Sequence, residues 1–180
     1  MKSRWAVIGL AVIAVLASLV SYGLHQRSRT AGTAAPADSG RAGVKTVRLY
    51  FGAVSGDSLV SEAREMAEAS TLHERVAGLV AELDLGPRGR GVAVLPAGTS
   101  VLHVYLDDHG LMTLDLSGAF RQRFRGGSST EYLAIASLVR TLSANLPEAK
   151  RVLLVCAGRP TPTLGGHLPL DRPLDVGDWP

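Results

Sequence analysis

The sequence has a single cysteine, Cys156, few aromatic residues and none of the common nucleophile motifs. One cysteine cannot form an intrachain disulfide or a multi-cysteine zinc or iron–sulfur site. Aromatic residues make up 5% of the 180 residues, too few for a platform that stacks nucleic-acid bases. Neither G-x-S-x-G nor G-x-x-x-x-G-K-[ST] occurs, so a hydrolase nucleophile turn and a nucleotide-binding loop are both unsupported.

Basic charge is also scarce outside the N-terminal quarter. Residues 1–45 contain six basic residues and one acidic residue, which leaves 13 basic and 15 acidic residues in the rest of the chain. The sequence pI of about 9.3 therefore describes the N-terminal segment. Because duplex binding needs a basic surface, we expect no nucleic-acid partner.

Residues 5–24 form an uncharged apolar run of 20 residues. At 1.5 Å per residue, a helix of this length matches a hydrocarbon core of roughly 30 Å. Trp5 and Tyr22 lie near its ends, where aromatic rings favour the membrane interface. The run is longer than a signal-peptide core, and no cysteine follows it to carry a lipid. We expect residues 1–26 to form an uncleaved single-pass anchor, in preference to a cleaved signal or a buried soluble helix.

Residues 27–45 contain almost no large apolar side chain and are rich in Gly, Ala, Ser, Thr and Pro. Such a segment cannot bury enough surface to offset its ordering entropy. We therefore predict a flexible linker here, with an end-to-end distance of about 25 Å.

The first half of the remaining chain indicates a strand and a helix. Thr46–Phe51 alternates apolar and polar residues, as a half-buried strand requires. Leu59–Met66 is compatible with either a strand or the start of a helix. Thr71 and Glu74 form a capping box, followed by apolar residues at helical spacing, so we predict a helix that ends before Gly86-Pro87.

The segment 100–117 indicates a hairpin. If 108–110 form a three-residue loop, the register places Leu106 opposite Met112, and two further apolar pairs follow on the same face, Val104 with Leu114 and Leu102 with Leu116. The other face then receives two polar pairs, Tyr105 with Thr113 and His103 with Asp115. A one-residue slip would mix the two faces.

A second capping box, Ser128 and Glu131, predicts a longer helix that ends at Pro147, and Arg151–Cys156 indicates a short buried strand. The remainder is rich in Pro and Gly and should form turns. We predict an α+β fold of two layers, with helices packed on one face of a mixed β-sheet. The expected domain covers residues 46–170, and residues 171–180 form a C-terminal tail.

Two groups of residues are candidate binding surfaces, and neither contains a convincing catalytic set or metal site. The outer sheet face should carry six residues, which either meet a partner or are simply solvated: Arg48, Tyr50, His103, Tyr105, Thr113 and Asp115. His103 and Asp115 resemble a general-base dyad, but a cross-strand polar pair is the favoured interpretation. Asp107, Asp108 and His109 resemble metal ligands, but ordinary turn residues are the favoured interpretation.

The second group is basic. Arg121, Arg123 and Arg125 alternate just before the predicted second helix. Together with the backbone amides of Gly126 and Gly127, they could bind a phosphate or an anionic lipid head group. A solvated loop is the favoured alternative.

Several short segments resemble the GerMN domain, the sporulation and spore germination domain of extracytoplasmic bacterial proteins. They are T46-V-R-L-Y-F51, L59-V-x-E-A-R64, L79-V-A-E-L-x-L-G-P87, L95-P-A-G-T99, T113-L-D-L-S117 with Phe120, T141-L142 and A157-G158. The resemblance covers residues 45–170. It implies a small α+β domain akin to ring-building modules, without known catalytic residues, and it implies that Leu59–Met66 is extended. Relatives are often lipoproteins or carry two copies, whereas here we expect a helical anchor in place of the lipid and a single copy.

We therefore expect a non-catalytic binding or assembly module of the bacterial cell envelope, related to sporulation or germination and requiring no cofactor. It should be anchored in the cytoplasmic membrane with its domain on the extracytoplasmic side. The expected partner is an envelope protein or a second copy. The alternative is a module that binds cell-wall glycan or anionic lipid through the arginines, and a third hypothesis is a weak hydrolase that uses His103 and Asp115.

Overall fold

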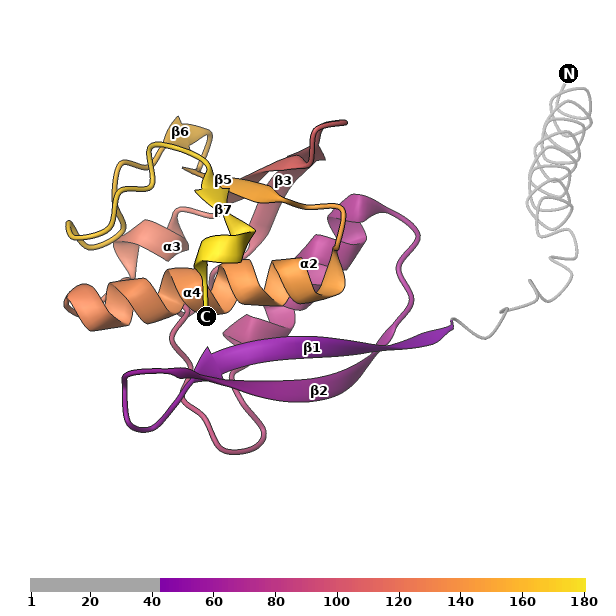
Figure 1. The fold of residues 1–180 in the computed structure, drawn as a ribbon, viewed down its shortest axis with the longest axis horizontal. Helices are drawn as coiled ribbons and strands as arrows, with labels where there is room; N and C mark the ends of the chain where they lie inside the picture. Colours follow the sequence, from indigo (N-terminus) through magenta and orange to yellow (C-terminus); the bar gives the residue numbers. More distant parts are fainter. Residues whose placement is uncertain (1–42) are drawn as a thin grey trace, which may run out of the picture. The chain divides into compact units, whose positions relative to one another are not determined.

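A computed structural model describes residues 43–180 of the chain (Figure 1). The predicted anchor and all but the end of the predicted linker lie outside these residues. Within the described part, no helix has both the length and the apolar character needed to cross a bilayer. The main elements are β1 (Val44–Gly52), β2 (Leu59–Ala67), α2 (Leu72–Asp84), β3 (Val101–Leu106), β4 (Leu111–Leu116), α3 (Ala119–Gln122), α4 (Ser128–Asn145), β5 (Arg151–Cys156), β6 (Arg159–Pro160), β7 (Leu174–Asp175) and the 3-10 helix η1 (Val176–Asp178).

The α+β class is confirmed, but the single mixed sheet is wrong. β1 and β2 form an antiparallel two-stranded ribbon of their own. The other five strands form a separate mixed sheet in which β4 pairs parallel with β5, while β3, β6 and β7 are added antiparallel. The alternation of apolar residues shows which face of a strand is buried, but it does not identify the neighbouring strand.

Helix α4 runs alongside β1 and completes its hydrogen bonding (Figure 1). Asn145 accepts from the Arg48 N–H (3.0 Å) and donates to the Arg48 carbonyl (2.7 Å). Thr141 accepts from the Tyr50 N–H (3.0 Å), and the Ser137 hydroxyl donates to the Tyr50 carbonyl (2.5 Å). These three α4 residues lie four apart, on one face of the helix. The outer edge of β1 is therefore covered by helix side chains rather than by a strand.

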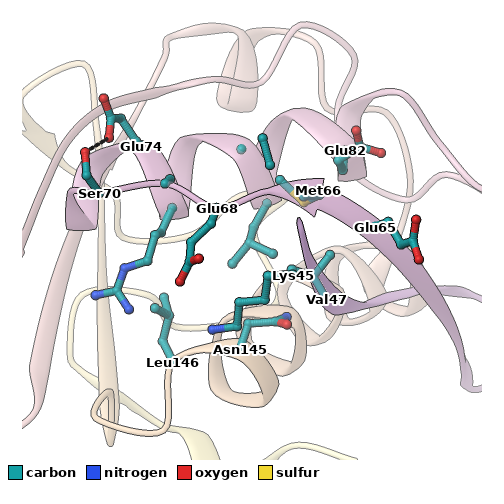
Figure 2. Close-up of a pocket in the computed structure, with 15 residues that line it drawn as sticks. Lys45, Val47, Glu65, Met66, Glu68, Ser70, Glu74, Glu82, Asn145 and Leu146 are labelled. Atoms are coloured by element: carbon teal, nitrogen blue, oxygen red, sulfur yellow. Dashed lines mark hydrogen bonds between the residues drawn. The ribbon is translucent and has the colours of Figure 1, made fainter. Parts of the chain in front are cut away.

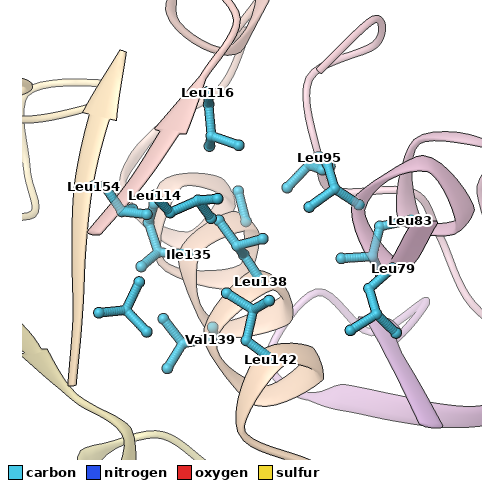
Figure 3. Close-up of a cluster of buried hydrophobic side chains, with 14 of the residues drawn as sticks. Leu79, Leu83, Leu95, Leu114, Leu116, Ile135, Leu138, Val139, Leu142 and Leu154 are labelled. Atoms are coloured by element: carbon cyan, nitrogen blue, oxygen red, sulfur yellow. The ribbon is translucent and has the colours of Figure 1, made fainter. Parts of the chain in front are cut away.

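One hydrophobic core joins the two sheets and the helices. In Figure 3, Leu138 and Leu142 of α4 lie between Leu114 of the larger sheet and Leu79 of α2. Helix α4 is buried on most of its surface because it packs against elements on several sides. Core residues continue to the end of the described chain, since Leu174 and Trp179 are also buried.

The first predicted capping box is confirmed and the second is wrong. Thr71 accepts from the Glu74 N–H, and the Glu74 carboxylate accepts from the Thr71 N–H (3.2 and 3.1 Å). At α4, however, Gly127 occupies the N-cap position, and no side chain caps the helix there. Glu131 is instead fully buried and binds the segment after β5, which no local pattern could indicate.

The hairpin register is confirmed over most of its length and wrong at one residue. Leu106 pairs with Met112 and Val104 with Leu114. A bulge between Val101 and His103 then shifts β3, so that Val101 takes the place opposite Leu116 that we predicted for Leu102. The bulge leaves the Leu102 side chain 40% exposed. Leu59–Met66 is extended, as the GerMN resemblance implied.

Candidate functional site

The six residues predicted to share one sheet face lie on two different sheets. Arg48 and Tyr50 project from β1, whereas the other four, His103, Tyr105, Thr113 and Asp115, belong to the β3–β4 hairpin. The single continuous face is therefore wrong, although the two polar pairs predicted within the hairpin are present. That the β1 pair binds a partner, and that the four hairpin residues do so, are now two separate predictions.

Arg48 and Tyr50 line a groove with a residue that the sequence interpretation missed, Arg140 of α4. The Arg140 guanidinium lies over the Tyr50 ring, with its central carbon 5.2 Å from the ring centroid. Thr46 and Ser143 add hydroxyl groups to the lining of the groove, which has a volume of about 660 Å³. We call this hollow the Arg48–Arg140 groove.

The Arg48–Arg140 groove is positively charged. Of the described residues that line it, none is acidic. In the part of the chain that the structure describes, neither arginine forms an ion pair, and Arg140 Nε is buried without a hydrogen-bond partner. The side chains project from a strand and a helix that are bonded to each other, so their spacing is fixed by regular structure. The planar guanidinium group of an arginine presents paired N–H donors whose spacing matches a carboxylate or another oxyanion.

A second groove lies on the α2 side of the ribbon and has a different character (Figure 2). Its volume is about 570 Å³, and its apolar lining includes Val47, Met66, Leu79 and Leu146. Figure 2 shows Lys45 and Glu68 pointing into the hollow. Four glutamates and two basic residues line it in all, so its charge is mixed, with an acidic excess of two.

The β3–β4 hairpin carries an exposed surface rather than an assembled reaction centre. His103 Nδ1 lies 3.4 Å from Asp115 Oδ2, and the His103 side chain is 85% exposed. The Asp115 carboxylate also accepts the Gly158 N–H at 3.0 Å. Among residues 43–180, no hydroxyl or thiol is hydrogen-bonded to His103. The geometry is that of a cross-strand polar pair, beside an exposed Tyr105.

The predicted arginine cluster is largely bonded to the local backbone. Arg123 Nη1 donates to the Ala97 carbonyl (3.3 Å), and Arg125 Nη1 donates to the Phe124 carbonyl (2.6 Å). Arg121 lies in the four-residue helix α3. Two of the three side chains thus stabilise turns, which leaves fewer donors for an anionic ligand.

Residues 43–180 contain no cluster of three or more histidine, cysteine or acidic side chains with a geometry suited to a metal ion. Cys156 is buried in β5, with its sulfur 3.4 Å from the Ser117 carbonyl oxygen. A thiol in this position packs as a small apolar side chain.

The comparisons with known proteins give one consistent family. A family model described as sporulation and spore germination matches residues 48–162. No curated protein matches the chain.

Three solved structures share the fold at low sequence identity. Tandem GerMN domains of the sporulation protein GerM from Bacillus subtilis align with 19% identity and a TM-score of 0.61, over 76% of this chain and 48% of that one. The first GerMN domain alone gives 21% identity and a TM-score of 0.54, over 73% and 97%. A candidate lipoprotein from Clostridium perfringens gives 19% identity and a TM-score of 0.53, over 76% and 90%. At these identities the structures establish the fold.

Proposed function

Because this chain belongs to the sporulation and spore germination (GerMN) family, we propose that it is a non-catalytic binding module of the bacterial cell envelope, held at the membrane by its N-terminal segment. The family description supports a link to sporulation or germination, and the similar lipoprotein supports a membrane-associated location. Here the apolar run 5–24 takes the part that a lipid plays in a lipoprotein.

The Arg48–Arg140 groove is the observation that carries the binding role. Two arginines that form no ion pair within residues 43–180, set on a rigid strand and helix, are pre-organised for an anionic ligand. We expect the partner to present carboxylate groups, as an acidic segment of an envelope protein does. Arginine and tyrosine are also the residue types that most often dominate protein interfaces.

Site-specific photocrosslinking in native membranes tests this function. A photoreactive amino acid at Ala144, an exposed residue that lines the groove, should form an adduct with an envelope protein, and Arg140→Gln should strongly reduce that adduct without lowering the thermal unfolding temperature. Arg172→Gln is the matched control, because Arg172 is an exposed arginine that does not line the groove.

The same experiment at two other positions compares the remaining predicted surfaces. Adducts only from Tyr105 would transfer the function to the hairpin. Adducts only from Arg121, with lipid or glycan, would favour the alternative of a glycan- or lipid-binding module. Equal labelling from Ala144 with and without the Arg140 change would contradict the role of the groove. The hydrolase hypothesis gains no support, since His103 is hydrogen-bonded to Asp115 alone in the described part of the chain.

The anchor makes a separate prediction. The full chain should stay in the membrane pellet after high-salt and alkaline washing, whereas a chain without residues 1–26 should be recovered in the soluble fraction. An apolar stretch of 20 residues inserts far more strongly than an electrostatically bound surface. Recovery of a soluble form shortened by about 24 residues, as measured by mass spectrometry, would instead indicate a cleaved signal peptide.

A further inference from the structure

Among residues 43–180, no strand pairs with the outer edge of β2. In the antiparallel ribbon, the backbone groups of Arg48 and Tyr50 point away from β2, because they bond α4 side chains. Their cross-strand partners, Ala63 and Ser61, must then point their own N–H and C=O groups away from β1. The same alternation applies to Glu65. None of these three residues is backbone-bonded to another segment within residues 43–180.

This edge differs from the other two long edges of the fold. The edge of β1 is covered by α4, as described above. The edge strand β3 has six residues and is interrupted by a bulge, and both features discourage pairing with another chain. β2 has nine residues, no proline and no bulge, and Ser61, Ala63 and Glu65 are all exposed. It is therefore the edge best suited to accept another strand.

The sequence of β2 is complementary to itself in one register. A two-fold axis at Ala63 sets Ala63 opposite its own copy and uses every outward N–H and C=O of the strand. It places Glu62 opposite Arg64 and Val60 opposite Met66, each twice, with no like charges facing each other. The neighbouring registers that use the same outward groups have their axis at Glu62 or Arg64 and would set two Glu62 or two Arg64 side chains against each other. An axis at Glu65 would set two Glu65 side chains against each other. Moving it to Ser61 would shorten the pairing, since the turn before Leu59 would be reached.

We propose that two copies of this chain associate by antiparallel pairing of their β2 strands about Ala63, which joins two ribbons into one four-stranded sheet. Backbone hydrogen bonds supply the affinity, as in other cases of strand addition. The absence of facing like charges sets the register. The interface is isologous, so it closes at two copies. This goes beyond the proposed function and uses neither arginine of the groove.

Disulfide trapping of the full chain in native membranes tests the pairing. All variants carry Cys156→Ser, which removes the natural thiol. Ala63→Cys should give a covalent dimer on oxidation, because directly opposed residues have Cα atoms about 5.5 Å apart, within disulfide range. Glu65→Cys is the matched control on the same edge. Its two copies would lie about 13 Å apart along the strands and should give no dimer.

A double variant tests the register and guards against failure of the single change. Ser61→Cys with Glu65→Cys should form dimers, because residue 61 faces residue 65 of the other copy, and adding Ala63→Pro should abolish them. The Ala63 N–H points outward, so proline removes an intermolecular bond without removing one to β1. Equal dimer yields from Ala63→Cys and Glu65→Cys would overturn the proposal. So would the failure of both Ala63→Cys and the double variant to form dimers, or the formation of an adduct to a different protein instead.

Discussion

Replacing Arg64 with alanine is expected to lower the free energy of unfolding by about 3–5 kcal/mol, the cost typical of breaking a buried ion pair. Arg64 is only 4% exposed, yet its guanidinium is fully engaged. It binds Glu62 (2.7 Å) and Glu82 (2.6 Å), and it donates to the Gly86 carbonyl at the end of α2 (2.6 Å). Burial works against the charge, but the bonds to Glu82 and Glu62 outweigh it and raise the pKa of Arg64 above its ordinary value.

Arg64→Lys is an informative companion variant. Lysine keeps the charge, but its single ammonium group cannot bond both carboxylates and the carbonyl at once, as the planar guanidinium does. We therefore expect a smaller but clear loss of stability. Chemical denaturation with circular dichroism measures both changes. Glu65→Ala, one residue further on the exposed face, should change stability by no more than about 0.5 kcal/mol. A loss below about 1 kcal/mol for Arg64→Ala would contradict the role assigned to this network.

Replacing Glu131 with glutamine is expected to cost about 3 kcal/mol at neutral pH, in the range of a charged hydrogen-bond acceptor that is lost from a buried site. The Glu131 carboxylate is fully buried and accepts N–H bonds from Leu164 and His167, both at 2.9 Å. His167 Nδ1 lies 3.0 Å from the same carboxylate. The NH₂ group of glutamine is itself a donor, so it cannot accept the hydrogen bonds that one carboxylate oxygen accepts. The segment after β5 would then be held less firmly against α4.

The effect of Glu131 should depend on pH with a definite sign. Burial disfavours ionisation, but the backbone N–H donors and His167 outweigh it and hold the pKa of Glu131 below its ordinary 4.5. The stabilisation is therefore complete above about pH 4.5 and is lost as the pH falls through the lowered pKa of the folded state. Stability measured from pH 7 to pH 3 should show wild type and Glu131→Gln converging at the acid end.

His167→Ala separates the two kinds of donor. This change removes the side-chain contact and leaves both backbone donors in place, so we expect a smaller loss than for Glu131→Gln. A constant stability difference between wild type and Glu131→Gln down to pH 3 would contradict the assignment of the buried charge to Glu131.

Sequence patterns predicted the parts of the fold whose partners are close along the chain. The Thr71–Glu74 box and the hairpin pairs of Tyr105 with Thr113 and His103 with Asp115 all involve local neighbours. The division into two sheets was not predictable in this way. The groups that satisfy the outer edge of β1 come from Asn145 and Thr141, 97 and 91 residues from their partners.

The candidate site was predictable to a similar extent. Alternation along β1 placed Arg48 and Tyr50 on a polar face, but it could not indicate that an arginine from α4 lies over the tyrosine ring. One signal was available in the sequence. Ser137, Thr141 and Asn145 repeat every four residues on one side of a largely buried helix, and such a row needs a polar partner. Arg140 is adjacent to that row.

The covering of β1 by α4 also has a consequence for biosynthesis. β1 is translated early in the folded domain, but the side chains that complete its outer edge are 87 to 97 residues further along the chain. At ribosomal speeds of about 5–20 residues per second, that distance corresponds to about 4–20 s of elongation. During this interval the nascent hairpin exposes both of its edges, so the first strands to be made are among the last to be completed.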